Sequence, residues 1–250
     1  IPYFTDRRIP ASNHPVIRVV LSVFGIINDD WSYASVFGYL RSGFIYRKKG
    51  KEIEAISADE IDRLELFVKK RGIRGRKAWL GEEKWVSGSD GLFDAVMGTG
   101  AILDAGEIDK IRKEVMAPFA TLIEKIRGRR RAREIAEGLF EFLQEIHLYE
   151  GLEKERKNLE NKGFLIEAKH LGEIWDLLMD TLDQLVLTCG DEYISRENFA
   201  VMLEAGLSEC AVDTVPRSSD CVSISSANDS RPVRVKVLFA VGAVRSQMPL

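Results

Sequence analysis

Val233–Gly242 reads VRVKVLFAVG, a run of apolar and β-branched residues that only Arg234 and Lys236 interrupt. The run is too short for a comfortable helix, and it ends directly at Gly242. Such runs are typical of buried strands in a sheet that is covered on both faces. We therefore expect a strand at Val235–Val241, close to the end of the chain.

Two other segments with strand character also lie near the chain ends. Ile1–Thr5 has an extended pattern, in which Pro2 favours a strand start or an edge, and Cys221–Ser225 precedes the apolar run. The residues between them recur mostly at helical spacing. The sequence therefore predicts a mainly α-helical protein with a small α/β part. Residues 13–215 would form an inserted helical subdomain, and residues 1–12 and 216–250 a parallel-sheet remnant.

Local signals set several boundaries within the helical part. Ser57 and Glu60 form a capping box in front of a helix that should stop at Gly72. Pro118 is expected to kink or divide the helix that follows Glu107. Ser195 should cap the last helix. The polar and basic segment 44–56 predicts a loop.

Composition excludes some classes of protein. The 250 residues are 45% hydrophobic and 30% charged, which is ordinary for a globular protein. A net charge of −3 gives no global basic field, so any nucleic-acid contact must be local. The 3 cysteines lack CxxC spacing, which favours a reducing compartment. With no leader pattern and no long apolar run, we expect a cytoplasmic location and no membrane partner.

No catalytic or metal-binding motif is present in the sequence. His14, His147 and His170 lie far apart and outside any zinc-ligand spacing. GxSxG, GxxxxGK[ST] and GxGxxG are all absent, so no nucleophile elbow or nucleotide-binding loop is predicted. We expect no catalytic residue, metal or cofactor in this chain itself. Its ends, at Ile1 and Leu250, suggest a piece of a longer protein.

A basic turn, Gly72–Lys77, is the first candidate nucleic-acid contact. Its sequence is Gly72-Ile-Arg74-Gly75-Arg76-Lys77. Glycines at a helix end can expose backbone N–H groups, and the three cations add charge, so the turn is a candidate phosphate clamp. The alternative is a glycine helix stop followed by a solvated basic turn.

An arginine cluster is the second candidate. Residues 127–133 hold 5 arginines, and Arg129, Arg130 and Arg131 are consecutive. A DNA or RNA backbone is one possible partner. The alternative is a solvated helix face on which the arginines pair with glutamates at i,i+4 spacing. Those glutamates are Glu134, Glu137 and Glu141.

A series of short motifs, in order along nearly the whole chain, resembles one family. The motifs are IPYFTDRR at 1–8, Trp31-Ser-Tyr33, Val36–Gly43, Gly72–Gly75, Trp175–Leu185, Phe199–Leu207 and Asp229-x-Arg231. Together they are similar to the B subunit of AddAB-type ATP-dependent helicase/deoxyribonucleases. At the chain ends, IPYF before a helical insertion resembles the second motor domain of UvrD-type superfamily-one helicases. No single motif is specific, whereas the series is.

The resemblance implies a fragment of a RecA-like second helicase domain with its inserted helical subdomain. It implies a parent protein that processes DNA double-strand ends for recombinational repair, paired with an A subunit. In that family ATP, Mg and an iron–sulfur cluster belong to domains outside these residues. The expected role here is non-catalytic, through DNA contact or scaffolding.

The chain departs from the pattern of an active motor. Aligned on Gly242, the family's Lys-Gly-Leu-Glu positions fall on Arg231, Pro232, Val233 and Arg234. Proline removes an N–H and arginine reverses the charge of the glutamate, so coupling of ATP to DNA is not expected. An active UvrD-type motor piece is therefore a weaker alternative. Another alternative is a structural helical module that docks the partner subunit, using Trp31, Trp79, Trp85 or Trp175 if any of them is exposed.

Overall fold

The computed structural model describes residues 3–5, 9–50, 52–85, 104–212, 222–224 and 236–241. The chain divides into two compact units. The larger is Ile9–Val212, and the smaller combines Ile1–Arg8 with Asp213–Leu250.

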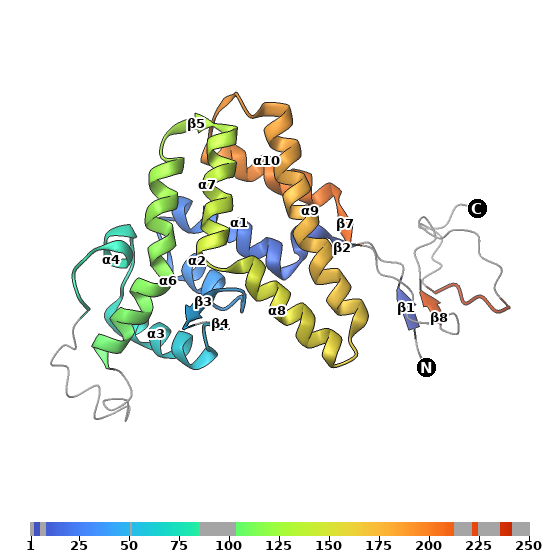
Figure 1. Ribbon diagram of the computed structural model, residues 1–250, viewed down its shortest axis with the longest axis horizontal. Helices are drawn as coiled ribbons and strands as arrows, with labels where there is room; N and C mark the ends of the chain where they lie inside the picture. The colour runs from blue at the N-terminus through green and yellow to red at the C-terminus, as the bar shows by residue number, and fades with distance from the viewer. Residues whose placement is uncertain are drawn as a thin grey trace. The chain divides into compact units, whose positions relative to one another are not determined.

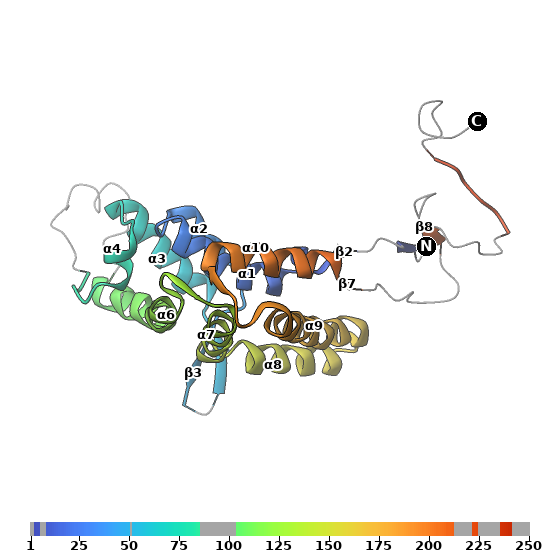
Figure 2. The same cartoon turned by 90° about the horizontal axis from the view of Figure 1, so that it is seen from above.

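The larger unit is built mainly of helices, which confirms the predicted helical character (Figures 1 and 2). Its described helices are α1 Pro15–Asn28, α2 Tyr33–Leu40, α3 Ala58–Arg71, α4 Arg76–Leu80, α6 Ala105–Ile126, α7 Ala132–Glu145, α8 Leu148–Asn161, α9 Leu165–Cys189 and α10 Arg196–Glu209, with a 3₁₀ turn at Ala11–Asn13.

The predicted helix caps are confirmed. The Ser57 side chain accepts a hydrogen bond from the Glu60 backbone N–H, and the Glu60 carboxylate accepts one from Ser57 N–H. Ser195 accepts from the Asn198 N–H at 3.2 Å. Each cap satisfies a backbone donor that the first helical turn leaves without a partner.

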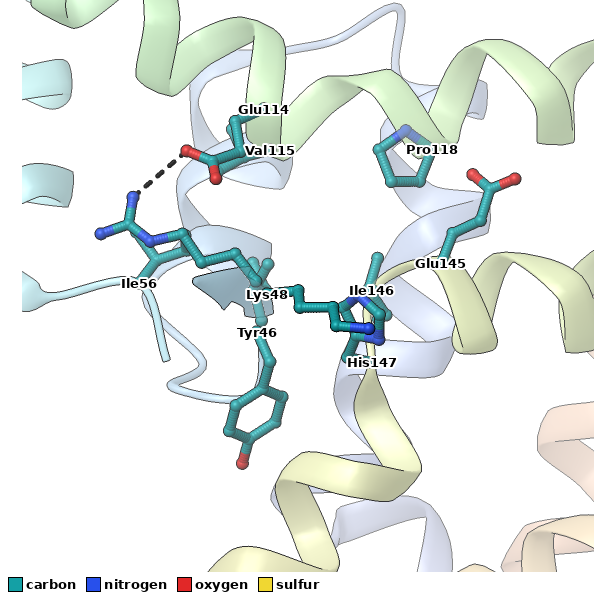
Figure 3. Close-up of a pocket in the computed structure, with 11 residues that line it drawn as sticks. Tyr46, Lys48, Ile56, Glu114, Val115, Pro118, Glu145, Ile146 and His147 are labelled. Carbon is teal, nitrogen blue, oxygen red and sulfur yellow. Dashed lines mark hydrogen bonds and ion pairs between the residues drawn. The ribbon is translucent and has the colours of Figure 1, made fainter. Parts of the chain in front are cut away.

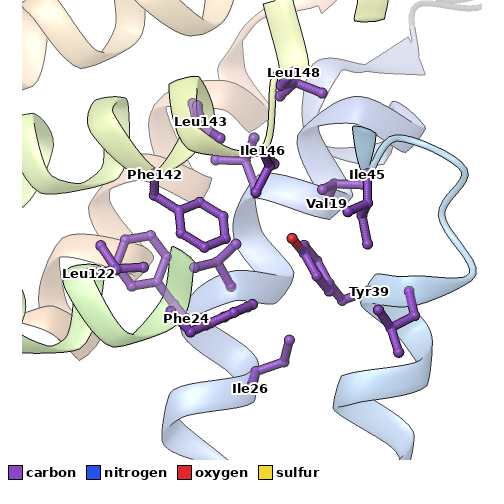
Figure 4. Close-up of a cluster of buried hydrophobic side chains, with 14 of the residues drawn as sticks. Val19, Phe24, Ile26, Tyr39, Ile45, Leu122, Phe142, Leu143, Ile146 and Leu148 are labelled. Carbon is purple, nitrogen blue, oxygen red and sulfur yellow. The ribbon is translucent and has the colours of Figure 1, made fainter. Parts of the chain in front are cut away.

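The core lies between α1, α2, α6 and α7 (Figure 4). Aromatic rings link these helices: Tyr39 and Phe142 both contact Phe119 edge-on, at centroid distances of 5.3 and 4.9 Å. Trp31 lies 5.0 Å from Phe119 and is fully buried. Burial of these apolar and aromatic side chains stabilises the unit.

Helix α6 runs unbroken through Pro118. We expected Pro118 to kink or divide this segment, and the division is not formed. A proline removes one backbone hydrogen bond, but Val115, Phe119 and Leu122 bury the same face of α6 in the core. Their packing stabilises one continuous helix.

Short antiparallel strand pairs connect the helices of the larger unit. They are β2 Ile9–Pro10 with β7 Ala211–Val212, β3 Tyr46–Lys49 with β4 Glu52–Ala55, and β5 Arg129–Arg131 with β6 Tyr193–Ser195.

The β3–β4 hairpin corrects the predicted loop at residues 44–56. Gly50, with φ of 68°, lies in the turn between the strands. Tyr46 N–H donates to the Ile146 carbonyl at 3.2 Å, and Ile45 and Ile56 are buried at the hairpin base. The contact with Ile146 comes from a distant part of the chain, and the strands themselves are polar, so the local sequence did not indicate the hairpin.

In the smaller unit, β1 Tyr3–Thr5 pairs in parallel with β8 Val222–Ile224. The strand predicted at Val235–Val241 is absent from its described residues, 236–241, where Leu238 and Phe239 are more than 80% exposed. That prediction of a buried strand is wrong here. A buried strand needs neighbouring strands and two covered faces, which the described residues of this unit do not supply. Residues 225–235, Gly242 and residues 243–250 lie outside the described part.

Among the described helices, none is both long enough and apolar enough to cross a membrane.

Candidate nucleic-acid interface

The basic turn, Gly72–Lys77, begins at the residue that caps the C-terminus of α3. Gly72 adopts the left-handed conformation, with φ of 60°, and its N–H donates to the Lys69 carbonyl. The N–H of Ile73 donates to the Val68 carbonyl at 3.1 Å. The glycine helix stop is therefore confirmed, and these two N–H groups cap α3 rather than face a ligand. Any phosphate contact must come from the rest of the turn.

The cations of the turn point to solvent. Arg74, Arg76 and Lys77 are exposed, and Gly75 is half-buried with φ of 83°. Arg76 Nη2 lies 3.9 Å from Glu124 Oε1, a long contact between two largely exposed groups. Within the described residues, Arg74 and Lys77 have no ion pair. The charge of the turn is therefore only partly balanced.

Two carboxylates lie beside the basic turn. One is Glu124, and the other is Asp30, whose Oδ2 would lie 3.9 Å from a Cβ added at Gly75. They lower the local positive potential without removing the three cations.

A buried arginine, Arg112 of α6, holds α4 in place behind the turn. Its side chain is 1% exposed. Nη1 donates to three carbonyl oxygens at the end of α4 and just beyond it, those of Ala78, Trp79 and Gly81, at 2.9–3.1 Å. Because these carbonyls have no helical partner, Arg112 supplies the missing donors.

Asp109 balances the charge of Arg112. Asp109 Oδ1 lies 2.6 Å from Arg112 Nη2 and accepts from the Trp85 backbone N–H at 3.3 Å. Burial opposes ionisation of Asp109, but hydrogen bonds from Lys113 and Trp85 and the charge of Arg112 hold its pKa below the usual value. The indole of Trp85 lies 4.9 Å from the Arg112 guanidinium.

The sequence-based prediction missed Arg112, although a signal for it exists. Ile108, Arg112, Val115 and Phe119 follow helical spacing, and the other three are buried. An arginine on the apolar stripe of a helix should be expected to carry buried hydrogen bonds.

The arginine cluster forms strand β5 and is exposed. Arg129 Nη2 donates to the Tyr193 carbonyl at 2.8 Å, and the Arg131 guanidinium lies 5.7 Å from the Tyr193 ring. Arg130 pairs in register with Ile194 through the backbone. Arg129–Arg131 therefore lie on a strand of a two-stranded sheet. The alternative interpretation had placed the arginines on a solvated helix face.

The predicted pairing with glutamates along α7 is not formed by the described residues. Glu134 instead accepts from the Arg131 backbone N–H at 3.0 Å, and Glu141 pairs with Lys125. Arg133 lies 3.8 Å from Asp191. Charges from outside the cluster therefore neutralise little of Arg129–Arg131.

One side chain of the basic turn reaches the C-terminal end of α6. Arg76 contacts Glu124 in the last turn of α6, and that helix ends at Ile126, just before β5 (Figure 1). Through Arg76, the basic turn therefore reaches the end of α6 that leads into β5.

A cavity of about 160 Å³ lies away from these residues, between the β3–β4 hairpin, α6 and the α7–α8 junction (Figure 3). Lys48 and His147 face it, with Glu145 beside them. Arg47, also in its wall, is paired with Glu60 at 2.8 Å and with Glu114 at 3.2 Å. The charges of this cavity are thus largely balanced.

The described residues contain no group of three or more His, Cys, Asp or Glu side chains placed to hold a metal ion. Two histidines that are distant in sequence do come near one another. Burial, and then the charge of His170, lower the pKa of His14.

No family model matches the chain. The B subunit of the ATP-dependent helicase/deoxyribonuclease of Clostridioides difficile (strain 630) is 33% identical over 257 residues, which cover 100% of this chain and 21% of that protein. The protein of the same name from Acetivibrio thermocellus is 32% identical over 247 residues, covering 97% of the chain and 20% of that protein. In the counterpart from Caldanaerobacter subterraneus subsp. tengcongensis the identity is 33% over 244 residues.

The chain is homologous to a part of the B subunit of these helicase/deoxyribonucleases. It spans about a fifth of the length of the curated relatives it matches. The resemblance drawn from the motifs is thereby confirmed at the level of the subunit.

The docking alternative named four tryptophans in case any of them is exposed, and the structure gives their burial. Trp31 and Trp79 are 1% exposed, and Trp85 and Trp175 are partly buried against the core. Trp31 and Trp79 are therefore unavailable to a partner, whereas Trp85 and Trp175 keep part of their surface in solvent.

Proposed function

We propose that this chain is a non-catalytic, DNA-contacting part of the B subunit of a helicase/deoxyribonuclease. Its basic turn, Gly72–Lys77, would contact the phosphate backbone, with Arg129–Arg131 as the second contact. The parent would process DNA double-strand ends for recombinational repair in the cytoplasm, together with an A-type subunit. ATP, Mg and an iron–sulfur cluster would belong to other parts of that parent.

The observation that carries the proposal is the exposure of the turn. A buried turn would have favoured scaffolding, whereas Arg74, Arg76 and Lys77 are exposed and only Arg76 has a described partner, at 3.9 Å. Flexible, solvated cations suit phosphate contacts that carry no sequence information.

The position of the turn adds support. Arg112 fixes α4 on α6 through carbonyls at 2.9–3.1 Å, so the first residues of α4, Arg76 and Lys77, project from a supported element. A preorganised contact loses less conformational freedom on binding than a mobile one.

The domain assignment is part of the same proposal. Residues 13–215 would be the inserted helical subdomain, and residues 1–12 and 216–250 the remnant of a RecA-like second helicase domain. The parallel pairing of β1 with β8, which brings the two chain ends together, supports this division.

Binding to a forked, fluorescein-labelled DNA across a salt series tests the proposal. The variant Arg74→Ala/Arg76→Ala/Lys77→Ala should weaken binding and reduce the negative salt slope by about 2 to 3, one for each lost phosphate contact. A matched control, Arg18→Ala/Lys110→Ala/Lys162→Ala, removes the same charge from exposed residues elsewhere and should change the slope little.

Equal losses in both variants would mean that only net charge matters, and the turn would not be the contact. Absence of binding by the wild-type chain at low salt would instead favour the scaffold interpretation, in which this module docks the A-type subunit.

A further inference from the structure

Helices α8 and α9 lie side by side (Figures 1 and 2). Residues of both helices line a cavity of about 220 Å³. Leu152 and Leu171 provide apolar wall, and Tyr149 and Trp175 provide aromatic wall. The two rings lie 5.1 Å apart at an angle of 47°. Tyr149 is 48% exposed, so the aromatic pair is open to solvent on one side.

Two carboxylates, Glu153 and Asp176, also line this cavity. The charge of Glu153 is balanced by Arg156, which donates hydrogen bonds to both carboxylate oxygens at 2.8 and 2.9 Å. These hydrogen bonds, and to a lesser extent the charge of Lys157, hold the pKa of Glu153 below its usual value. Asp176 is exposed and has no ion pair among the described residues. The cavity therefore keeps one uncompensated negative charge beside two aromatic rings.

The surface around Asp176 is acidic as well. Residues 171–189 of α9 contain 4 acidic residues and no lysine or arginine. Asp176, Asp180 and Asp183 recur at i, i+4 and i+7, which places them on one face of the helix, and all three are exposed. Such a face repels phosphate, which excludes the nucleic-acid backbone as its occupant.

We propose that the α8–α9 cavity is a docking site for a basic segment of a partner protein, into which one arginine or lysine side chain inserts. The aliphatic stem would lie on Leu152 and Leu171. The cation would lie over the rings of Tyr149 and Trp175 and pair with Asp176. Further cations of the same segment would face Asp180 and Asp183. This site is separate from the basic turn and does not depend on DNA binding.

The test uses the full chain and a fluorescein-labelled 12-residue peptide of leucine, alanine and arginine, followed by fluorescence anisotropy. A second peptide carries glutamate in place of arginine. The wild-type chain should bind the arginine peptide and not the glutamate peptide. Asp176→Asn and Trp175→Leu should each weaken binding about 5- to 10-fold.

Two controls separate the cavity from general effects. Glu204→Gln removes one exposed negative charge from α10 and should leave binding within about 2-fold. Circular dichroism should show that Asp176→Asn retains the wild-type fold, so its result holds even if Trp175→Leu proves unstable.

Three results would overturn the proposal. The first is no binding of the arginine peptide, or equal binding by the wild type and Asp176→Asn. The second is binding of a 30-nucleotide single strand that Trp175→Leu abolishes, which would make the rings a base-stacking site. The third is self-association that Asp176→Asn removes, which would assign the cavity to a second copy of the chain.

Discussion

At the scale of single residues, Glu65 of α3 is a buried carboxylate surrounded by donors. Lys69 Nζ lies 2.8 Å from Oε1, Arg41 Nε donates to Oε2 at 3.0 Å, and the Tyr33 hydroxyl also donates to this carboxylate. Burial opposes its ionisation, but the hydrogen bonds from Lys69, Tyr33 and Arg41 outweigh it and lower the pKa of Glu65 to about 2.

A pH dependence follows from this lowered pKa. The folded state binds the Glu65 proton more weakly than the unfolded state does, so ionised Glu65 stabilises the fold above the ordinary pKa of about 4.3. That contribution is lost as the pH falls from about 5 to 2. Glu65→Gln should lower the free energy of unfolding by about 1 kcal/mol at pH 7 and flatten its acid dependence. Urea unfolding of both chains at pH 7, 5 and 3.5 measures this, and an unchanged acid slope would refute it.

Gly151 is a second residue with a specific steric role. A Cβ added there would overlap the ring of Tyr46, so α8 can approach β3 closely only at a glycine. Gly151→Ala should lower the free energy of unfolding by about 1–3 kcal/mol. The matched control is Gly172→Ala in α9, whose Cβ would meet only Arg156 Cδ, at 3.9 Å.

The control should be neutral or stabilising by up to about 1 kcal/mol, because alanine favours helix more than glycine does. Thermal unfolding of the two variants compares them directly. Equal changes in stability in Gly151→Ala and Gly172→Ala would show that helix propensity, rather than overlap with the Tyr46 ring, determines the effect of a Cβ at position 151.

At the scale of elements, the sequence predicted the helices best where a local signal marks the boundary. Ser57, Gly72 and Ser195 each act on backbone groups a few residues away, and the structure places a cap or stop at each. Strands were predicted less well. The β3–β4 hairpin pairs locally, but its strands are polar and lack the usual strand pattern. Strand β5 is polar too, and its partner lies far along the chain, as Tyr193 does for Arg131.

The candidate site shows the same division. Exposure of the basic turn agrees with its polar composition, and the glycine stop could be predicted from Gly72. The hydrogen bonds from Arg112 to α4 could not be predicted in this way, because their acceptors are backbone carbonyls, which every residue has. Side-chain types do not reveal partners of that kind.

Helix α4 should depend on Arg112 for its attachment to α6. Arg112→Met leaves Asp109 buried without its closest cation and removes the Arg112 donor from the Trp79 and Gly81 carbonyls, whereas the Ala78 carbonyl keeps the Trp85 indole N–H, so the free energy of unfolding should fall by about 3–5 kcal/mol. Lys113→Met removes the other, half-exposed partner of Asp109, which lies 2.9 Å away, and should cost less than about 1 kcal/mol.

Amide hydrogen exchange distinguishes loss of the helix from loss of the whole fold. Exchange in residues 76–80 should rise more in Arg112→Met than exchange in α7. A uniform rise across both helices would contradict a local role for Arg112.

At the scale of the whole molecule, the chain presents surfaces of opposite charge. Exposed cations lie on the basic turn, at Arg74, Arg76 and Lys77, and on Arg129–Arg131. Helix α9 carries Asp176, Asp180 and Asp183 exposed on one face. A net charge of −3 conceals this separation. Opposed surfaces of this kind allow one module to face DNA on one side and a protein partner on another.

The most direct measurement is amide hydrogen exchange of the whole chain with and without forked DNA at low salt. The account predicts slower exchange in residues 72–77 and 129–131 when DNA is bound, with α8 and α9 unchanged. Protection centred on α8 and α9, or no protection while DNA is demonstrably bound, would contradict the assignment of the basic turn as the DNA contact.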